Sequence, residues 1–253
     1  MDIFVLCLLG LVQGLCEFLP ISSSGHLVLL SNIFGIEDSL FVSIILHVAT
    51  LLAVVIVFRE DLIEMLRHPF SQKSMNIYIA TIPTCIIVLI LLPIVESSFG
   101  GQFLAFSFLI SSLLLTFSQR FVVKNNFQTN FTYKNALIMG IAQGLAVFPG
   151  LSRSGTTICA GLLSKADKKE CAKFSFLMSI PIILLSMVME IYKIIVGGDT
   201  VVVNTFGLMI AFIIAFLVGI VSIKVMMKVT EKANFKWFSL YLLALALITF
   251  LFL

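Results

Sequence analysis

Charged residues are scarce in this chain of 253 residues: they make up 11% of it, whereas 60% of the residues are hydrophobic. A soluble domain usually carries about a quarter charged residues. The composition therefore excludes an ordinary soluble domain and indicates that the lipid bilayer is the solvent. The formal net charge is only +3, and the lysine-rich segments show no nucleic-acid-binding pattern. We expect membrane lipids, and no nucleic acid, among the partners.

Two further absences narrow the class of protein. The five cysteines form no Cys-x-x-Cys pair, which argues against a zinc site or a disulfide framework, and most lie in apolar segments as small hydrophobic residues. The first ten residues, MDIFVLCLLG, contain no basic residue, which argues against a cleaved signal peptide. The sequence thus predicts one integral membrane domain over residues 1–253.

Six apolar segments are long enough to cross a membrane, for which a helix needs roughly 20 mostly apolar residues. Pro83 and Pro181 fall inside two of these segments and are expected to kink them, so the freed carbonyl groups must find a neighbour. The predicted fold is therefore an all-α polytopic membrane protein. The six predicted spans are Leu40–Phe58, Asn76–Val95, Gln102–Ser118, Ala172–Val196, Thr205–Met227 and Trp237–Leu253.

Four shorter apolar pieces form two pairs, each interrupted by a polar turn. Ile3–Phe18 precedes Gly25–Phe34, and Asn135–Phe148 precedes Ser154–Leu163. Irregular backbone at membrane depth is tolerated only inside protein or around a watery cavity. Each pair therefore predicts a re-entrant helical hairpin.

The two turns are similar to each other. GLVQGLCEFLPISSSGH (Gly10–His26) aligns without gaps with GIAQGLAVFPGLSRSGT (Gly140–Thr156), and eight of the seventeen positions are identical. Chance similarity is the weaker interpretation, because QGL and SxSG keep one register. The sequence predicts inverted repeats over approximately 1–118 and 135–253. Each has one hairpin and three spans, and the site lies where the interrupted elements meet.

The placement of charge predicts the orientation. Fourteen of the 16 basic residues fall in four segments that an outside N-terminus would make cytoplasmic. The predicted outside loops are mainly acidic, so the positive-inside rule puts both termini outside. The basic residues of the four inside segments are Arg59, Arg67 and Lys73; Arg120, Lys124 and Lys134; Lys165, Lys168, Lys169 and Lys173; and Lys224, Lys228, Lys232 and Lys236.

Three ionisable side chains, Glu17, His26 and Arg153, lie inside the predicted hairpins. Ionisable groups at membrane depth cost about 2.5–3.5 kcal/mol on insertion scales and normally mark a site or a pathway. One interpretation is an ion pair of Glu17 with Arg153 that only locks the hairpins together. His47, in the first span, either lines the cavity or is a packed, hydrogen-bonded histidine. The ion pair leaves unexplained the hydroxyls of Ser22, Ser23 and Ser24 in one turn and of Ser152, Ser154, Thr156 and Thr157 in the other.

The second turn, PGLSRSGTT (Pro149–Thr157), is a candidate phosphate-binding loop. Arg153 lies just before the half-helix that is predicted to begin near Ser154, and the free N–H groups of a helix start bind anions. The arginine fork adds bidentate recognition of phosphate, and Gly150 and Gly155 let the backbone approach closely. Opposite a turn with Glu, Ser and His, this loop predicts a catalytic site with anion binding on one hairpin and reacting groups on the other.

The two turns together resemble the signatures of the undecaprenyl-pyrophosphate phosphatases, the bacitracin-resistance integral membrane phosphatases. The first signature, Glu or Gln followed after three residues by Glu, matches Gln13 and Glu17 and leads into FLPISSSGH. The second, PG-x-SRS-G-x-T, matches Pro149–Thr157. Many members carry a second glutamate where this chain has Gln13. A neutral amide cannot act as a base, and it weakens a metal site that needs two carboxylates.

The resemblance implies hydrolysis of undecaprenyl (C55) pyrophosphate to undecaprenyl phosphate and phosphate, which recycles the carrier lipid for cell-wall synthesis and confers bacitracin resistance. It implies a multi-pass protein of the cytoplasmic (inner) membrane with a site that faces the outer side. It also implies a divalent cation, Mg²⁺ or Ca²⁺, bound with low specificity. The sequence leaves a homodimer open.

The resemblance also assigns roles to residues. The expected catalytic residues are Glu17, Ser23, His26 and Arg153, and Glu17 is the expected metal ligand. The nucleophile is left open: Ser23, which matches the family's catalytic serine and is favoured, or Ser24 attacks with His26 as base. Alternatively, His26 takes the phosphoryl group, or Glu17 or the metal activates water. The expected substrate-binding residues are Gln13, Ser22, Ser24, Ser152, Ser154 and Thr157.

A transporter that flips a polyprenyl-phosphate lipid is the alternative function, because an inverted repeat suits alternating access. The dense set of Ser, His and Arg exceeds what transport alone requires and favours the enzyme. Phosphate release by detergent-purified protein separates the two, because transport needs two compartments. A purely structural membrane subunit is the third and weakest interpretation.

Overall fold

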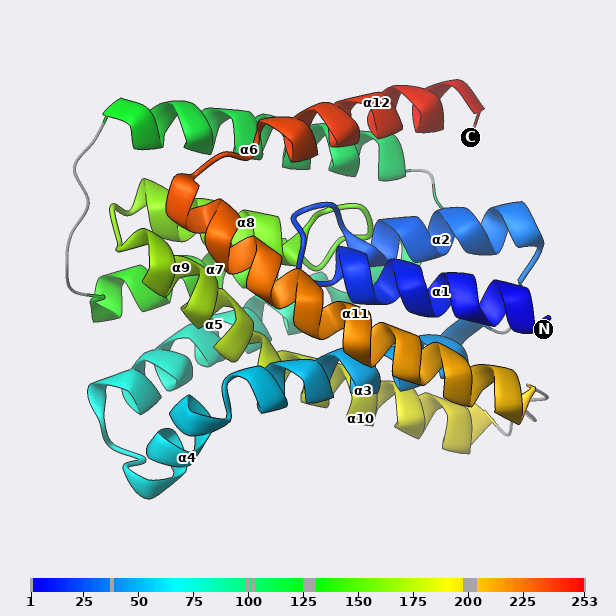
Figure 1. Cartoon of the computed structure of the whole chain (residues 1–253), viewed down its shortest axis with the longest axis horizontal. Helices are drawn as coiled ribbons and strands as arrows, with labels where there is room; N and C mark the ends of the chain where they lie inside the picture. The colour runs from blue at the N-terminus through cyan, green and yellow to red at the C-terminus, as the bar shows by residue number, and fades with distance from the viewer. Residues whose placement is uncertain are drawn as a thin grey trace.

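The computed structural model describes residues 2–36, 39–98, 101, 103–124, 131–197 and 204–252. Within these residues the regular structure is entirely helical, and most helices lie along the long axis of the molecule (Figure 1). The helices are α1 (Ile3–Cys16), α2 (Ser23–Phe34), α3 (Ser39–Val57), α4 (Arg59–Arg67), α5 (Gln72–Ser98), α6 (Leu104–Lys124), α7 (Tyr133–Leu145), α8 (Arg153–Leu163), α9 (Lys168–Leu177), α10 (Ser179–Gly197), α11 (Thr205–Lys232) and α12 (Lys236–Phe252).

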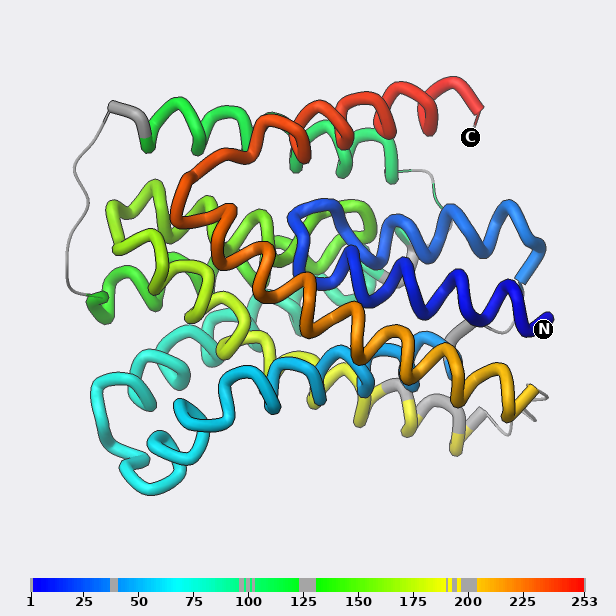
Figure 2. The backbone as a smooth tube through the Cα atoms, in the orientation of Figure 1, coloured from blue at the N-terminus to red at the C-terminus, as the bar shows by residue number. Residues whose placement is uncertain are grey.

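Two helical hairpins enter the bundle from opposite ends and turn back near its middle. α1 and α2 form the first, α7 and α8 form the second, and Figure 2 shows the chain reversing at both tips. The tips touch, because the Ser154 hydroxyl donates to the Leu19 carbonyl at 3.2 Å. A Cβ on Gly25 would lie only 2.8 Å from the Cα of Gly150. The re-entrant description also needs a position in the membrane and stays a prediction.

Five of the six predicted spans coincide with helices that are long and apolar enough to cross a membrane. One of the five is a bent pair, Phe41–Val57 followed by Arg59–Arg67, with a bend of 76° that the sequence did not reveal. The sixth predicted span, Trp237–Leu253, falls on α12, which has 17 residues and is shorter than the others. The other four of the five are Gln72–Val95, Leu104–Val122, Lys168–Met189, which comprises α9 and the first part of α10, and Thr205–Lys232.

The kink expected at Pro181 lies three residues earlier. The helix breaks at Met178, between α9 and α10, and Pro181 lies in the first turn of α10, where its missing N–H is not needed. The side chain of Gln143 donates to the Met178 carbonyl at 3.2 Å, so this carbonyl at the break finds a partner. At the other predicted kink, α5 continues as one helix through Pro83.

Each hairpin packs against a long helix from the other half of the chain. α1 lies along α11, and α7 lies along α5. Both contacts use a Gly-x-x-x-Gly face, which allows close approach of two helices in a membrane. A Cβ on Gly10 would lie 2.4 Å from the Ala211 carbonyl oxygen, and one on Gly140 would lie 2.3 Å from the Ala80 carbonyl oxygen. The two hairpins are therefore held by the same kind of contact, whereas the duplication itself stays a prediction.

A methyl group at Gly10 is expected to destabilise the fold. The substitution Gly10→Ala forces α1 away from the α11 backbone, and overpacking of this kind costs typically about 1–3 kcal/mol. We expect a midpoint of thermal unfolding in detergent that is lower by roughly 3–10 °C. Gly219→Ala is the matched control, because its Cβ would meet only side-chain atoms and no backbone, the nearest being Phe18 at 3.1 Å and Ala53 at 3.3 Å. Equal midpoints for the two variants would contradict the close contact.

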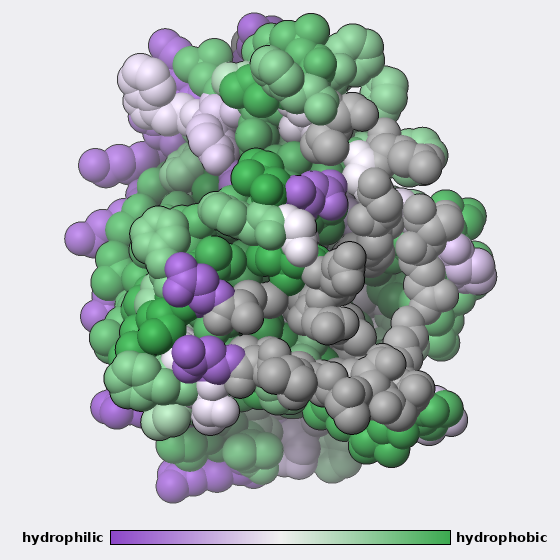
Figure 3. All heavy atoms as spheres, turned by 90° about the vertical axis from the view of Figure 1, so that its right-hand side faces the viewer, coloured by the Kyte–Doolittle hydropathy of each residue, from purple (hydrophilic) through white to green (hydrophobic). Residues whose placement is uncertain are grey.

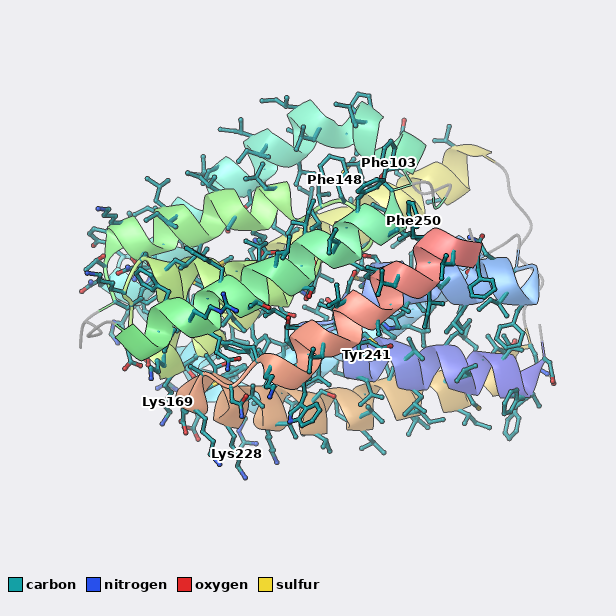
Figure 4. All side chains as sticks on the ribbon, turned by 90° about the horizontal axis from the view of Figure 1, so that it is seen from above. Phe103, Phe148, Lys169, Lys228, Tyr241 and Phe250 are labelled. Carbon is teal, nitrogen blue, oxygen red and sulfur yellow. The ribbon has the colours of Figure 1, made fainter. Side chains whose placement is uncertain are left out.

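Basic residues gather at the end of the bundle opposite the termini. Figure 1 shows both termini at one end, and Figure 4 places Lys169 and Lys228 at the other, away from Phe103 and Phe250. At the lysine end, Asp61 accepts hydrogen bonds from Lys73 and Lys173, each at 2.6 Å, and ties α4 to α5 and α9. Figure 3 views the end with the termini, where apolar side chains cover much of the described surface. Among the acidic residues expected outside, Glu37, Asp38 and Asp199 and the side chain of Glu96 lie outside the described part.

Candidate active site at the meeting of the hairpin tips

Glu17 lies at the centre of the contact between the two tips. It follows the last residue of α1, and its backbone N–H still donates to the Gln13 carbonyl at 3.0 Å. The helical turn thus carries on for one residue, and residues four apart share a helix face. The Gln13 side-chain amide donates to Glu17 Oε2 at 3.1 Å. Both side chains are buried, which places a carboxylate and an amide together in the interior.

The Glu17 carboxylate collects partners from three separate segments. Ser23, the first residue of α2, donates its hydroxyl to Oε2 at 2.6 Å. Arg153, the first residue of α8, donates Nη2 to Oε1. His47 Nε2, on α3, lies 3.7 Å from Oε2. A buried charge is tolerated only when it is paired and hydrogen-bonded. The expected Glu17–Arg153 pair therefore exists, but it belongs to a larger polar cluster and is not an isolated lock.

The two half-helices begin with the same cap. The Ser22 hydroxyl accepts from the Gly25 N–H at 3.3 Å, and the Ser152 hydroxyl accepts from the Gly155 N–H at 3.1 Å. These serines occupy equivalent positions in the gap-free alignment of the two turns. α2 and α8 start at the touching tips and run toward opposite ends (Figure 1), so two helix N-termini face each other. Each N-terminus attracts negative charge, and together they favour an anion between the tips.

Three buried polar atoms around this point lack a partner among the described residues. They are the donors Arg153 Nη1 and Thr156 Oγ1 and the acceptor Gln13 Oε1. Leaving such a group unsatisfied costs about 1–3 kcal/mol, and more when it is charged. The two unpaired donors can bind an anionic ligand. The unpaired amide oxygen can bind a cation or accept a hydrogen bond. The cluster is thus built with unused hydrogen-bonding capacity.

His26 makes a set of contacts that differs from the set around Glu17. Its Nδ1 lies 2.7 Å from the Ser22 carbonyl oxygen, and its Nε2 lies 2.6 Å from the Tyr241 hydroxyl on α12. The edge of the imidazole faces the Phe108 ring, with the ring centroids 5.9 Å apart. Neither nitrogen of the ring contacts Ser23 in the described structure, so the structure does not pair these two residues as base and nucleophile. The catalytic role of His26 stays a prediction.

The other hydroxyls expected to bind substrate are mostly engaged elsewhere. Ser154 holds the Leu19 carbonyl, and Thr157 donates within α8 and contacts Ser175 Oγ at 2.6 Å, where it fixes α8 against α9. The Ser24 hydroxyl lies 3.4 Å from the Ser22 hydroxyl. Ser22 and Ser152 are helix caps, as described above. These residues shape the tips, and their expected contacts with substrate stay a prediction.

Two site residues are missing from the sequence-based set. His47 lies beside Glu17, and its Nδ1 lies 2.8 Å from the Ser43 carbonyl oxygen, so it is a hydrogen-bonded histidine. Its place in the wall of a cavity stays a prediction. A histidine within the apolar run ILHVATLLAV was a signal, although its partner could not be known. Tyr241 gave no signal, because a tyrosine in an apolar membrane helix is ordinary.

A cavity elsewhere in the molecule does not compete with this site. It measures about 670 Å³ and lies at the lysine end. Its lysines, Lys73 and Lys173, already share Asp61, and it contains no residue of the Glu17 cluster. The residues that line it are Gln72, Lys73, Asn76, Phe131, Thr132, Glu170, Lys173, Phe174 and Leu177.

The cluster offers few protein ligands for a metal. Within the described residues, no three His, Cys, Asp or Glu side chains come together in a group that could hold an ion. The oxygen donors near the tips are the Glu17 carboxylate and the unpartnered Gln13 Oε1. Mg²⁺ is commonly bound through one or two carboxylates together with substrate phosphates and water. The donor set therefore fits a cation shared with a phosphate ligand, and not a closed metal site.

Comparison with known proteins agrees with this chemistry. Residues 6–248 match the family model described as bacitracin resistance protein BacA. Similar proteins occur in Carboxydothermus hydrogenoformans (36% identical, 95% of this chain and 94% of the relative) and Christiangramia forsetii (37%, 100% and 98%). Another occurs in Methanobrevibacter smithii (34%, 99% and 98%), and all three relatives are named undecaprenyl-diphosphatase. The chain is a multi-pass membrane protein that belongs to the bacitracin resistance protein BacA family.

Proposed function

We propose that this protein hydrolyses undecaprenyl diphosphate to undecaprenyl phosphate and inorganic phosphate. Membership of the family and the full-length similarity to proteins named undecaprenyl-diphosphatase support this activity. Recycling of the carrier lipid for cell-wall synthesis, and with it bacitracin resistance, follows from the same reaction. The polar cluster favours hydrolysis over lipid transport alone, because it combines a hydroxyl, a carboxylate and a guanidinium at one point.

The observation that carries the proposal is the unpartnered Nη1 of Arg153. This buried donor lies where the N-termini of α2 and α8 face each other, next to the Glu17–Ser23 pair. Guanidinium groups and helix N-termini both bind phosphate, and positioned positive charge is the main lever in phosphoryl transfer. The terminal phosphate of the substrate would therefore bind to Arg153 between the tips.

Ser23 is the proposed nucleophile, because its hydroxyl already donates to Glu17 at 2.6 Å. In the first step, Ser23 Oγ bonds to the terminal phosphorus, its proton passes to Glu17, and the bond to the leaving undecaprenyl phosphate breaks. In the second step, water attacks the phosphoserine and gives its proton to His26 Nε2. The Ser23–phosphorus bond breaks, Ser23 regains its proton from Glu17, and His26 releases the proton taken from water to the solvent. Dividing the reaction in this way is typical of covalent catalysis.

A divalent cation, Mg²⁺ or Ca²⁺, is proposed as a cofactor held by Glu17 and Gln13 Oε1 together with the substrate. It would supply positive charge that neutralises the diphosphate. The unpartnered Gln13 Oε1 supports this assignment. A site with one carboxylate is expected to bind the cation weakly in the absence of substrate.

We further propose six membrane spans, with α12 as the last, and two re-entrant hairpins in an inverted repeat. The protein would lie in the cytoplasmic membrane with both termini and the opening of the site on the outer side. The gathering of lysines at the end opposite the termini supports this orientation under the positive-inside rule (Figure 4). The polyprenyl tail of the substrate would extend between helices into the lipid.

A phosphate-release assay tests the activity, the cofactor and the orientation together. Detergent-purified protein is expected to release phosphate from C55 and C15 diphosphates, and EDTA is expected to lower the rate by at least about tenfold. In right-side-out vesicles, C15 diphosphate added outside should be hydrolysed, whereas inside-out vesicles should leave it intact. No phosphate release by folded, metal-supplied protein would refute the enzyme and favour the transporter. Full activity in EDTA would refute the proposed cation cofactor. Hydrolysis in inside-out vesicles alone would reverse the proposed orientation in the membrane.

A further inference from the structure

Tyr241 contacts His26 in two ways, through a hydrogen bond and through stacking of the two rings. The two residues are 215 positions apart in the chain, yet the Tyr241 hydroxyl lies 2.6 Å from His26 Nε2. The rings are stacked with an interplanar angle of 7° and centroids 5.7 Å apart. Figure 4 places Tyr241 on α12 near the middle of the long axis, level with the hairpin tips. A helix from the C-terminal end of the chain thus covers a histidine of the first hairpin.

The hydrogen bonds assign the protons of His26. A carbonyl oxygen only accepts, so Nδ1, which lies 2.7 Å from the Ser22 carbonyl, carries the hydrogen. A neutral imidazole then has its single lone pair on Nε2, and the Tyr241 hydroxyl donates to that lone pair. Any atom that His26 attacks or deprotonates must therefore take the place now held by the Tyr241 oxygen. The reactive nitrogen is occupied before substrate arrives.

We propose that Tyr241 caps His26 Nε2 in the substrate-free enzyme and transfers its hydrogen bond to an oxygen of the diphosphate when substrate binds. A hydroxyl bonds more strongly to an anionic oxygen than to a neutral nitrogen, roughly by a factor of two. The diphosphate is the only part of a polyprenyl diphosphate that offers such oxygens. Its arrival would free the lone pair at the moment when the water step needs a base. The identification of the ligand as a diphosphate rests on the proposed function. The hydrogen bond between Tyr241 and His26 does not.

The fold does not need the Tyr241 hydroxyl to hold α12 in place. Ser112 on α6 donates to the Ser239 carbonyl at 2.8 Å, and Thr116 Oγ1 lies 2.6 Å from Ser239 Oγ. These bonds tie α12 to α6 along its first turn. Tyr241 is itself 44% exposed, so its side chain is not enclosed by the packing of α12. The variant Tyr241→Phe keeps the stacked ring and should fold.

Chemical modification of histidine tests the cap without substrate. Diethyl pyrocarbonate reacts with the free lone pair of imidazole, and residue-resolved mass spectrometry separates the three histidines. In Tyr241→Phe, His26 should react about twofold to tenfold faster than in the wild type, the range that one hydrogen bond supplies. Exposed His68 is the internal reference, and its rate should stay constant. An unchanged rate at His26 would overturn the cap, whether or not the protein is a phosphatase.

Steady-state kinetics with C15 diphosphate test the transfer of the hydrogen bond. We expect Tyr241→Phe to raise KM by about fivefold with kcat within about twofold, because the variant lacks the stronger bond to the anionic oxygen. Tyr78→Phe is the matched control, since Tyr78 is similarly exposed at 46% and lies on α5. A lower kcat with unchanged KM would show that Tyr241 only positions His26 and would overturn the transfer. Absence of hydrolysis by the wild type would refute the proposed function. The hydrogen bond from Tyr241 to His26 would then be tested by the histidine modification alone.

Discussion

Replacing Arg153 with alanine is expected to lower kcat/KM for C15 diphosphate by about 10³-fold or more. Among the described residues, the pair of Arg153 with Glu17 is the only ion pair between the two tips. Arg153 also has a second buried donor, Nη1, that is free to bind substrate. Loss of a single positioned donor in an active site costs about 10²–10³-fold. Arg153→Ala removes that donor and also leaves Glu17 as a buried carboxylate without its cation. Phosphate release by purified, folded protein measures the effect.

Arg153→Lys is the informative control for this prediction. It keeps the positive charge but loses the planar fork that can bond Glu17 and a phosphate together. We expect it to recover less than a tenth of the lost activity while restoring most of the lost thermal stability. If Arg153→Ala retained more than about a tenth of wild-type activity, phosphate binding at the tips would be wrong. Equal thermal midpoints for wild type and Arg153→Ala would show that the Glu17 pair contributes little to the fold.

Replacing His26 with alanine is expected to stop the reaction after its first step. Ser23 keeps its hydrogen bond to Glu17 in this variant, so the phosphoryl group should still transfer to Ser23. Without His26 the water that cleaves phosphoserine lacks its base, and general-base catalysis contributes typically 10²–10⁴-fold. We therefore expect turnover to fall by about 10³-fold and phosphoserine to accumulate. Mass spectrometry of acid-quenched protein, incubated with C15 diphosphate, checks both results.

The double variant Ser23→Ala/His26→Ala is the control. It should carry no phosphate, and its turnover should equal that of Ser23→Ala, because the first step is already blocked. If phosphohistidine is trapped on His26 in the wild type or in Ser23→Ala, the nucleophile is His26 and not Ser23. Absence of any phosphorylated residue, together with turnover by Ser23→Ala, would favour direct attack by water. Each of these results selects one of the three routes that the sequence alone leaves open.

The local pattern of the sequence was sufficient to predict the hairpins and their meeting. Gly10 and Gly140 open equivalent motifs, and the interruption of each apolar run by proline and serine marks the tips. Burying Glu17 and Arg153 at membrane depth made their pairing foreseeable, since neither charge is tolerated alone. Both residues lie in recognisable turns, so their pairing could be inferred although they are 136 positions apart in the chain.

What the sequence could not provide were contacts made by residues that lie outside the two turns. The approach of His47 to Glu17 depends on how α3 packs, and the contact of Tyr241 with His26 depends on how α12 packs. The bend after Val57 was also missed, and the break expected at Pro181 lies at Met178. Hydropathy measures how apolar a segment is and carries no information about its direction. Tertiary packing decides these features, and they include the residue on which the further inference rests.

The packing of α1 against α11 has a consequence for biosynthesis. α1 is synthesised before α11, but its glycine face meets Ala211 and Ala215, which are made about two hundred residues later. Until then the first hairpin lacks the long helix against which α1 packs, so α1 remains in the insertion machinery or in a shallow position at the bilayer surface. A nascent chain that stops before α11 should therefore be a substrate for membrane proteases, whereas one that stops within α12 should already hold its first hairpin in place.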